Sequence, residues 1–361
     1  MAEPKLAITG LTKRYGSFTA LAPTDLEVAE GEFLTLLGPS GSGKTTLLSL
    51  IAGLSVPDGG QLRINGQDAT YAAAHERDIG MVFQNYALFP HMTVAENIAF
   101  PLKMRRVDSA SAGKRVMEAL ELVRLPQVAS RFPKELSGGQ QQRIALARCL
   151  VYKPSIVLMD EPLGALDKKL RDHMQLEIKR IHRDTGATIV YVTHDQEEAM
   201  TMSDRICLMN GGTIEQLGTP SDLYFRPKTL FVADFIGESN LLRGSVSAPN
   251  GSNVEVTLDD GTTRVTATAH TPMASGDKVR VMVRPQNIAP AANGANTLRG
   301  RVVDSMITGS LTKLYLESPF SGEEPIVLSY PTSAATRPHA VGSELAFSWQ
   351  PGDAVAVPEL A

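Results

Sequence analysis

The sequence predicts an α/β domain with a largely parallel sheet, followed by an all-β domain of the barrel type. Short β-rich runs alternate with helical patterns from Leu6 to about Gly218, which is the order expected for a parallel sheet flanked by helices. From about residue 240, apolar and polar residues alternate strictly between turn signals. We therefore expect a first domain over residues 1–236 and a second domain over residues 237–361.

The first domain contains apolar runs that predict its strands. These runs are Phe33–Leu37, Ile79–Phe83, Ile156–Met159, Thr188–Val192 and Arg205–Met209. Leu170, Met174, Ile178 and Ile181 recur at the spacing of one helix face, between basic residues that we interpret as a solvated face. The stretch from about 86 to 150 lacks a convincing strand and carries another amphipathic pattern, so we expect a helical subdomain there.

The second domain follows a hinge-like segment rich in glycine and proline, Gly218–Pro227, and a short helix. Alternating residues on both sides of Asp260-Gly261 are typical of a β-hairpin with a primed turn. Further short strands are expected over Lys278–Val283, Gly300–Asp304, Lys313–Glu317, Ile326–Ser329 and Glu344–Phe347. This spacing of strands and turns predicts an all-β barrel.

The composition excludes several classes of protein. Apolar residues make up 43% of the 361 residues and charged residues 20%, which is an ordinary globular mixture. The 35 Lys and Arg against 39 Asp and Glu give a net charge of -4, so no nucleic-acid partner is indicated. Cys149 and Cys207 lie far apart among apolar neighbours, which favours buried free thiols. We find neither a secretory signal nor roughly 18 consecutive apolar residues, so we expect a protein that stays in the cytoplasm.

The first candidate site is a glycine-rich run. It lies between a predicted strand and a predicted helix, and the helix is expected over Thr46–Leu54. Residues 38–45 read GPSGSGKT, which fits the phosphate-loop pattern G-x-x-x-x-G-K-[ST]. The glycines let backbone N–H groups face an anion, the lysine reaches the β- and γ-phosphates, and the threonine hydroxyl binds Mg²⁺. A turn that only capped a helix would not explain the lysine and the threonine. The predicted ATP-binding residues are Gly38, Pro39, Ser40, Gly41, Ser42, Gly43, Lys44, Thr45 and Thr46, with Thr45 also a metal ligand.

Two adjacent acids follow the apolar run Ile156–Met159. Asp160 and Glu161 are expected at the carboxyl edge of a buried parallel strand, where nucleotides bind in open α/β sheets. Because neighbouring side chains on a strand point in different directions, Asp160 can serve the Mg²⁺ shell while Glu161 deprotonates the attacking water. The alternative is that these acids cap a helix.

Between these elements, residues 136–140 read LSGGQ and lead into a predicted helix. A phosphate loop, LSGGQ and an apolar run that ends in Asp-Glu together resemble the ATP-binding cassette (ABC) ATPases over essentially residues 5–235. The resemblance implies a P-loop NTPase with a RecA-like sheet and a helical subdomain. It also implies that the LSGGQ run completes the ATP site of a second copy, so that Ser137, Gly138, Gly139 and Gln140 bind the partner's ATP.

The same resemblance assigns roles to single residues. Tyr15 resembles the aromatic residue that stacks on adenine, and Gln84 the glutamine that contacts metal and water. Asp167 resembles the aspartate that crosses the dimer interface, and His194 the histidine that contacts the γ-phosphate. The alternatives are a surface tyrosine, a helix cap at Asp167 and an ordinary core or surface histidine. Asp195 and Glu198 have the spacing of a capping box, and we interpret both as structural.

Two further segments resemble parts of importer ATPases. The run QNYALFPHMTV at Gln84–Val94 resembles the groove that receives a permease helix, with Tyr86, Phe89 and Pro90 as an apolar socket. Ordinary packing of the helical subdomain is the alternative. The tail from about residue 241 resembles the paired OB-like (TOBE) barrels of importer ATPases. Members of that family usually have Glu at the position of Gln286 in this chain, so a regulatory contact assigned to the Glu is not carried over to Gln286.

The runs EFLTLLGPSGSGKTTLL and QNYALFPHMTVAENI are most similar to the spermidine/putrescine type of importer ATPase. This implies a peripheral subunit on the cytoplasmic face of the inner membrane, working with a second copy of itself, two permease subunits and an extracytoplasmic solute-binding protein. Ferric iron and aminoalkylphosphonate importers are the alternatives. A soluble ABC ATPase of DNA repair or translation, and a regulatory nucleotide-binding module, are alternatives from other classes.

Overall fold

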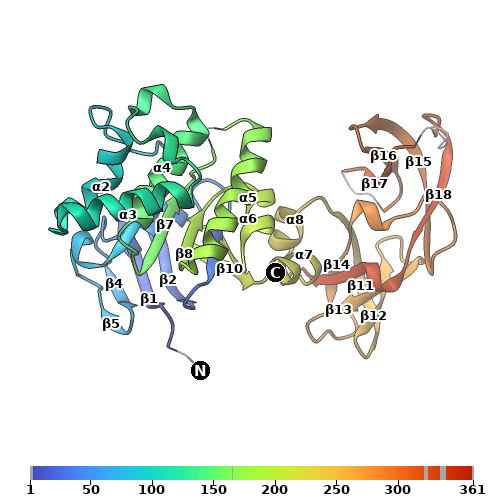
Figure 1. Cartoon of the computed structure of the whole chain (residues 1–361). Coiled ribbons are helices and arrows are strands. Elements are labelled where there is room, and N and C mark those ends of the chain that lie inside the picture. Colours follow the sequence, from blue (N-terminus) through green and yellow to red (C-terminus); the bar gives the residue numbers. More distant parts are fainter. Residues whose placement is uncertain (1–2, 165, 321–323, 334–338, 360–361) are drawn as a thin grey trace. The chain divides into compact units, whose positions relative to one another are not determined.

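The computed structural model describes residues 3–164, 166–320, 324–333 and 339–359. It divides into two compact units, residues 1–220 and 221–361. Figure 1 shows helices and sheets in the first unit and mainly strands in the second. Among the described residues, no helix is long and apolar enough to cross a membrane.

The central sheet of the first unit has the strand order β10-β9-β3-β8-β7-β6. Neighbouring strands from β9 to β6 run parallel, whereas β10 is antiparallel to β9. Every strand predicted for this sheet is present, so the prediction of a largely parallel α/β sheet is confirmed. The strands are β3 (Phe33–Leu37), β6 (Ile79–Val82), β7 (Ile156–Asp160), β8 (Ile189–Val192), β9 (Arg205–Asn210) and β10 (Thr213–Gly218).

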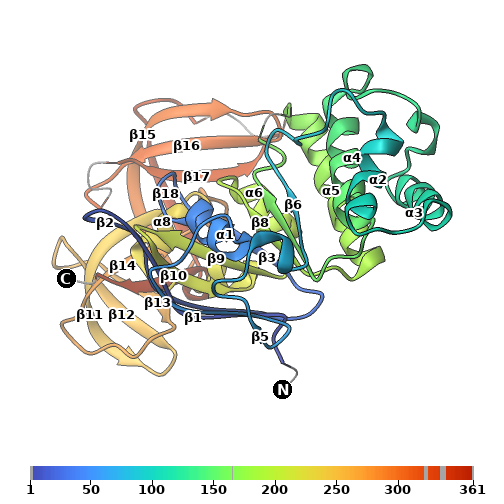
Figure 2. The same ribbon diagram turned by 90° about the vertical axis from the view of Figure 1, so that its left-hand side faces the viewer.

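An antiparallel sheet with the order β2-β1-β4-β5 was not expected from the sequence. One apolar core fills the space between the two sheets, and Leu47 and Ile51 of helix α1 are buried in it. Figure 2 shows α1 against the strands of the central sheet. The antiparallel strands are β1 (Leu6–Tyr15), β2 (Phe18–Val28), β4 (Gly59–Ile64) and β5 (Gln67–Asp68).

The opposite face of the central sheet packs on helices. Phe33, Met159 and Tyr191 of the sheet share a buried cluster with Met174 and Ile178 of helix α5. Because both faces are covered, the inner strands β3, β8 and β7 are buried almost continuously and do not alternate. Helices α2, α3 and α4 lie within the stretch 86–150 and gather beside this cluster (Figure 1). The helices are α1 (Lys44–Ala52), α2 (Val94–Met104), α3 (Ser109–Leu122), α4 (Gly138–Leu150), α5 (Lys168–Thr185) and α6 (Gln196–Met202), with 3₁₀ turns at η1 (Ala74–Glu76), η2 (Pro126–Val128) and η3 (Pro133–Glu135).

The hinge-like segment Gly218–Pro227 spans the boundary between the two units and contains helix α7 (Pro220–Phe225). Pro220 is the first residue of the helix, where its fixed φ angle is favourable and its missing N–H is not needed. The short helix expected next is present as α8 (Leu230–Phe235), capped by the side chain of Thr229.

The second unit contains a closed barrel with the strand order β11-β12-β13-β19-β14. The prediction of a barrel is therefore confirmed. The resemblance implied two barrels. The second of them is not closed in this structure but forms an open sheet with the order β17-β16-β15-β18. The strands are β11 (Asn240–Asn250), β12 (Asn253–Leu258), β13 (Arg264–Ala269), β14 (Lys278–Val283), β15 (Asn296–Ile307), β16 (Leu311–Glu317), β17 (Ile326–Pro331), β18 (Glu344–Trp349) and β19 (Ala354–Pro358), with 3₁₀ turns at η4 (Pro285–Asn287) and η5 (Pro351–Asp353).

The turn between β12 and β13 is not the primed turn that the sequence suggested. Gly261 has a φ of 72°, but Asp260 is not among the non-glycine residues with positive φ, and a type I′ turn needs positive φ at both central residues. The carboxylate of Asp260 instead accepts hydrogen bonds from the backbone N–H groups of Thr262 (3.0 Å) and Thr263 (2.8 Å). This side-chain acceptor stabilises a longer loop.

Candidate functional site

The glycine-rich loop connects β3 to α1, as expected, and two of its glycines are required by space as well as by conformation. Gly38 has a φ of 149°, and a Cβ atom there would lie 2.2 Å from the carbonyl oxygen of Met209. Gly43 has a φ of 100°, and its Cβ would lie 2.8 Å from the carbonyl oxygen of Ala20. The loop therefore lies directly against the backbone of its neighbours, and a side chain would displace it.

Lys44 is the first residue of α1 and is only 5% exposed. Its ammonium group donates to the carbonyl oxygens of Gly38 and Pro39, both at 2.8 Å. Burial lowers the pKa of Lys44, and the nearby carboxylates of Glu161 and Asp160 oppose that shift. The loop thus holds a cation at the start of a helix, whose free N–H groups also favour an anion.

The other predicted residues of the loop are arranged around this cation. Thr45 is exposed on the first turn of α1, whereas Ser42 is buried and its carbonyl accepts from Gly212 at 3.1 Å. The predicted helix start at Thr46 is two residues late, because α1 begins at Lys44. Pro39, Ser40 and Gly41 lie on the outer side of the loop, and a Cβ at Gly41 would meet nothing within 4 Å.

Asp160 is the last residue of β7 and Glu161 directly follows it. Burial raises the pKa of Asp160, the adjacent Glu161 raises it further, and Lys44 opposes both effects. Glu161 has a φ of 42°, an uncommon conformation for a residue with a side chain. Its backbone N–H donates to Val192 at 3.0 Å, which fixes the turn against the end of β8.

His194 and Gln84 approach Glu161 from the ends of two other strands. Nδ1 of His194 lies 3.2 Å from Oε1 of Glu161. An ideal Cβ at Gly164 would lie 3.5 Å from Nε2 of Gln84 and 4.0 Å from Oε2 of Glu161, so both side chains border this glycine. Strand β6 ends at Val82, one residue earlier than predicted, because its pairing with β7 ends there. The predicted residues Lys44, Gln84, Asp160, Glu161 and His194 therefore meet at the carboxyl edge of one sheet.

Asp195 and Glu198 both have structural roles, as expected, but only Asp195 acts as a cap. Asp195 caps α6 by accepting from the N–H of Glu198 at 3.2 Å. The carboxylate of Glu198 does not return to the cap. It is 2% exposed and accepts hydrogen bonds from the hydroxyls of Tyr191 (2.8 Å) and Thr193 (2.7 Å). This buried network, which the sequence did not suggest, fixes the strand end that precedes His194, and burial raises the pKa of Glu198.

Arg171 connects the same network to the turn before α5. Its guanidinium donates to the carboxylate of Asp195 at 3.0 Å and to the carbonyl of Leu166 at 3.2 Å. Asp167, in that turn, caps α5 by accepting from Leu170 at 2.9 Å. The capping role considered for Asp167 is therefore present. Ala165, which precedes this turn in the GALD run, lies outside the described residues.

The LSGGQ residues form the N-terminus of α4. Ser137 and Gln140 cap it reciprocally, since Ser137 Oγ accepts from the N–H of Gln140 and Gln140 Oε1 accepts from the N–H of Ser137 at 3.0 Å. A Cβ at Gly139 would lie 3.0 Å from Leu170 Cδ1, whereas Gly138 is exposed. Among the described residues, no hydrogen bond links these four residues to the phosphate loop of the same chain.

Tyr15 ends β1, and its ring is exposed beside the ammonium group of Lys13, 5.3 Å from the ring centre.

The expected apolar socket for a permease helix is only partly open, because Tyr86 is 8% exposed and belongs to the core. Phe89 is partly buried and packs on Phe100, with ring centres 4.7 Å apart. Ordinary packing therefore accounts for Tyr86.

Gln286 of the second unit donates a hydrogen bond to the hydroxyl of Tyr224.

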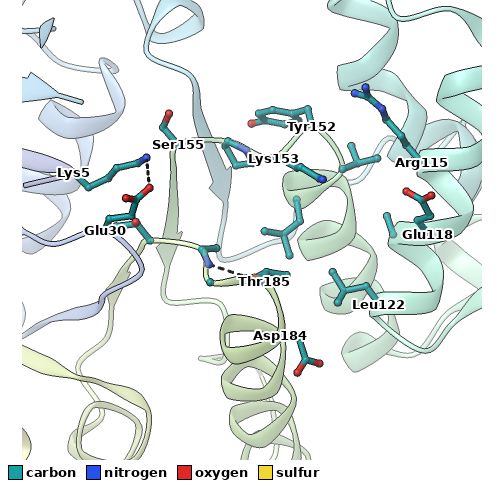
Figure 3. Close-up of a pocket in the computed structure, with 17 residues that line it drawn as sticks. Lys5, Glu30, Arg115, Glu118, Leu122, Tyr152, Lys153, Ser155, Asp184 and Thr185 are labelled. Carbon is teal, nitrogen blue, oxygen red and sulfur yellow. Dashed lines mark hydrogen bonds and ion pairs between the residues drawn. The ribbon is translucent and has the colours of Figure 1, made fainter. Parts of the chain in front are cut away.

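A cavity of about 640 Å³ lies at the opposite edge of the central sheet (Figure 3). It is lined by residues that precede β7 and β8, among them Lys153, Ser155 and Thr185, and by α3 with Glu118 and Leu122. None of the predicted site residues lines it. Parallel strands separate the two edges, so this cavity is distinct from the candidate site.

The comparisons with known proteins agree with this geometry. The family model described as ABC transporter matches residues 21–164, and the model described as TOBE domain matches residues 281–357. The chain therefore belongs to the ABC transporter ATPases that carry a C-terminal TOBE domain.

Curated relatives match it over nearly its whole length. The spermidine/putrescine import ATP-binding protein PotA of Thermobifida fusca is 47% identical and covers 99% of this chain and 94% of its own. The protein of the same name from Frankia alni is 45% identical, over 98% of this chain and 79% of its own. The protein of that name from Pseudomonas aeruginosa strain UCBPP-PA14 is 44% identical, and the match covers 97% of this chain and 98% of that protein.

Solved structures match the first part of the chain. The ATP-binding cassette MJ0796, solved as a dimer in a post-hydrolysis state with ADP and Pi, is 34% identical with a TM-score of 0.52. The match covers 60% of this chain and 98% of that one. The cbiO1 protein of Clostridium perfringens, part of the ABC transporter complex cbiONQ, is 25% identical with a TM-score of 0.58, over 62% and 91%.

Proposed function

We propose that this chain is the ATP-hydrolysing subunit of a polyamine importer. The observation that carries the enzymatic part is the meeting of Lys44, Glu161 and His194 at one edge of the sheet, with Nδ1 of His194 3.2 Å from Oε1 of Glu161. The spermidine/putrescine import proteins that match almost the full chain support the choice of solute. The proposed nucleotide-binding domain spans residues 1–236, with its helical subdomain at about 86–150, and the TOBE domain spans residues 237–361.

In the proposed mechanism, backbone N–H groups of residues 38–45 and the ammonium of Lys44 hold the phosphates of ATP. Glu161 accepts a proton from the water that attacks the γ-phosphorus, and the bond to the β-phosphate oxygen breaks as the new P–O bond forms. His194 orients the Glu161 carboxylate and contacts the γ-phosphate. Tyr15 stacks on the adenine ring, which its exposed position at the end of β1 permits.

The donors near the loop fit Mg²⁺, because a hydroxyl, a carboxylate and an amide oxygen are ligands of the type that hard cations prefer. Thr45, Asp160 and Gln84 would hold the ion, which neutralises phosphate charge when bound. Burial raises the pKa of Asp160 and the adjacent Glu161 raises it further, and a bound cation would oppose both effects by stabilising the ionised carboxylate.

The complete reaction site needs a second copy of the chain. Ser137, Gly138, Gly139 and Gln140 form a helix N-terminus that no hydrogen bond links to the loop of their own chain among the described residues, and this leaves it available to a partner's γ-phosphate. Asp167 would cross the interface while it caps α5. The dimeric state of the related cassette MJ0796 supports this arrangement.

A mixing experiment tests the shared site. Lys44→Ala disables the phosphate loop of one chain, and Ser137→Arg disables the LSGGQ run of another, so each variant alone should hydrolyse ATP at a background rate. In a mixed dimer one of the two sites combines an intact loop with an intact LSGGQ run. We expect the mixture to regain a measurable part of the wild-type rate of phosphate release. If the mixture stays at background although the two variants form a mixed dimer and Ser137→Arg still binds nucleotide, the shared site is wrong.

The proposed partners are two permease subunits, reached through residues 84–94, and indirectly an extracytoplasmic solute-binding protein. This places the chain on the cytoplasmic face of the inner membrane as a peripheral subunit. Deleting the gene and measuring uptake of labelled spermidine, putrescine, ferric iron and an aminoalkylphosphonate tests the solute. Loss of uptake of the two polyamines alone supports the proposal. Loss of iron or phosphonate uptake with normal polyamine uptake contradicts it.

A further inference from the structure

Arg77 is a buried cation whose partners are backbone carbonyls. The residue is 5% exposed, and burial lowers its pKa. Nη1 donates to the carbonyl oxygens of Leu50 (2.6 Å) and Ile51 (2.9 Å). Nε donates to Ala72 (2.9 Å) and Nη2 to Thr70 (3.3 Å). Among the described residues, no carboxylate forms an ion pair with this guanidinium, so its position is set by the carbonyl groups around it.

Two of these carbonyls belong to the last turn of α1, the helix that starts at the phosphate loop. The last four carbonyls of a helix lack partners within it, and a cation there is also favoured by the helix dipole. Gly53 leaves the space for this contact, because a Cβ there would lie 2.6 Å from Nε of Arg77. Arg77 therefore holds the end of α1 opposite to Lys44, about 13 Å away along the helix axis.

Arg77 is also connected through the main chain to strand β6. Asp78 follows Arg77, and then β6, which starts at Ile79 and ends two residues before Gln84. Strand β6 pairs in parallel with β7, the strand that ends at Asp160. A single side chain thus joins the helix that carries Lys44 and Thr45 to the start of the strand that leads to Gln84.

From this geometry we infer that Arg77 is a positioning residue for nucleotide binding. It fixes α1, and with it the phosphate loop, relative to the strands β6 and β7. The inference rests on the proposed function, since it assumes that the loop binds ATP. Loss of the guanidinium would release the end of α1 and allow Lys44 and the loop N–H groups to move away from the phosphates.

A matched control is available in the other unit. Arg284 is 1% exposed and donates to the backbone carbonyls of Tyr224 (3.0 Å), Glu238 (3.2 Å) and Ala233 (3.4 Å), and to Ser239 Oγ. It is the same kind of buried, carbonyl-bound arginine, but its partners lie outside α1. A purely structural role would make the two arginines equivalent in their effect on nucleotide binding.

The experiment compares Arg77→Gln, Arg77→Lys and Arg284→Gln in the full chain. The dissociation constant of methylanthraniloyl-ADP, KM and kcat for ATP, and the melting temperature are measured where circular dichroism shows each variant to be folded. We expect Arg77→Gln to weaken ADP binding at least about tenfold and to raise KM more than it lowers kcat, since small displacements of positioned groups have effects of this size. Arg77→Lys keeps the cation and should recover part of the affinity.

We expect Arg284→Gln to lower the melting temperature and leave the ADP dissociation constant within about twofold of wild type. Unchanged ADP affinity in Arg77→Gln, or an equal loss in Arg284→Gln, would overturn the inference. If Arg77→Gln does not fold, Arg77→Lys decides, and wild-type affinity in that variant despite a lower melting temperature would also overturn it. A wild-type chain that binds no ADP contradicts the proposed function itself, which separates the two failures.

Discussion

Nδ1 of His194 lies 3.2 Å from Oε1 of Glu161, although the two residues are 33 positions apart and follow different strands. Strands β7 and β8 are parallel neighbours, so residues that follow them emerge at the same edge. The Glu161 side chain is 26% exposed and that of His194 61%, so the pair is open to an incoming ligand. This pairing of a carboxylate and an imidazole is the basis of the first prediction.

Replacing Glu161 by Gln should stop hydrolysis and preserve nucleotide binding. The amide is nearly isosteric with the carboxylate but cannot accept the proton of the attacking water, so we expect the rate of phosphate release to fall by about 10²–10⁴. The dissociation constant for ATP should stay within a few fold of wild type. An E161Q variant that releases phosphate at the wild-type rate would exclude Glu161 as the general base.

Gly38→Ala should destabilise the first unit far more than Gly41→Ala. Both glycines have positive φ angles, but the new methyl group meets the carbonyl of Met209 at 2.2 Å in one case and nothing within 4 Å in the other. We expect losses of about 3 kcal/mol and about 1 kcal/mol, respectively, in the free energy of unfolding. Urea titrations of the two variants check this, and equal losses would contradict the close approach of Gly38 to β9.

The stability of the chain should depend on pH through Glu198. Burial raises the pKa of this carboxyl above its ordinary value of 4.5, so the folded chain retains a proton that the unfolded chain has released. The contribution of Glu198 to stability is therefore greatest below about pH 4.5 and declines as the pH rises through the folded-state pKa. In Glu198→Gln, the free energy of unfolding should fall less steeply between pH 4.5 and neutrality. Glu197→Gln, at an exposed neighbouring position, should retain the wild-type slope.

The two thiols should be unreactive in the folded chain. Cys149 and Cys207 are free and buried, and burial raises the pKa of each thiol to about 12, so the nucleophilic thiolate is scarce at neutral pH. We expect an aromatic disulfide reagent to titrate neither thiol in buffer and both in denaturant. Rapid titration of either thiol without denaturant would show that the core around it opens readily.

Runs of apolar residues and a motif with fixed spacing were sufficient to predict the parallel sheet and the phosphate loop. Buried parallel strands such as Ile156–Met159 are continuously apolar, and GPSGSGKT fixes both a conformation and a chemistry. That Lys44, Asp160 and Glu161 lie at one edge follows from the predicted parallel direction of the strands that precede them. The separate roles of these three residues were inferred from the motif and from their positions after the strands, whereas those of Gln84, His194 and Asp167 came from the resemblance. All of these roles stay predictions.

The features that the sequence did not reveal depend on contacts between distant residues. Glu198 has the spacing of a cap, and only the folded chain brings Tyr191 and Thr193 to its carboxylate. Arg77 looks like any other arginine before a strand until its guanidinium is seen at the end of α1. The turn at Asp260 was predicted wrongly because its carboxylate, rather than glycine conformation, decides the loop.

The barrel of the second unit is completed by β19, residues 354–358, which pairs with β13 and β14. The strands β15 to β18 lie between β14 and β19 in the sequence, so the ribosome makes them before β19. Until β19 emerges, β13 and β14 lack the backbone hydrogen bonds that close the barrel. The first unit, in contrast, has all its strands by residue 218. At a translation rate of about 5–20 residues per second, the nascent chain spends several seconds with one unit able to fold and the other awaiting its final strand.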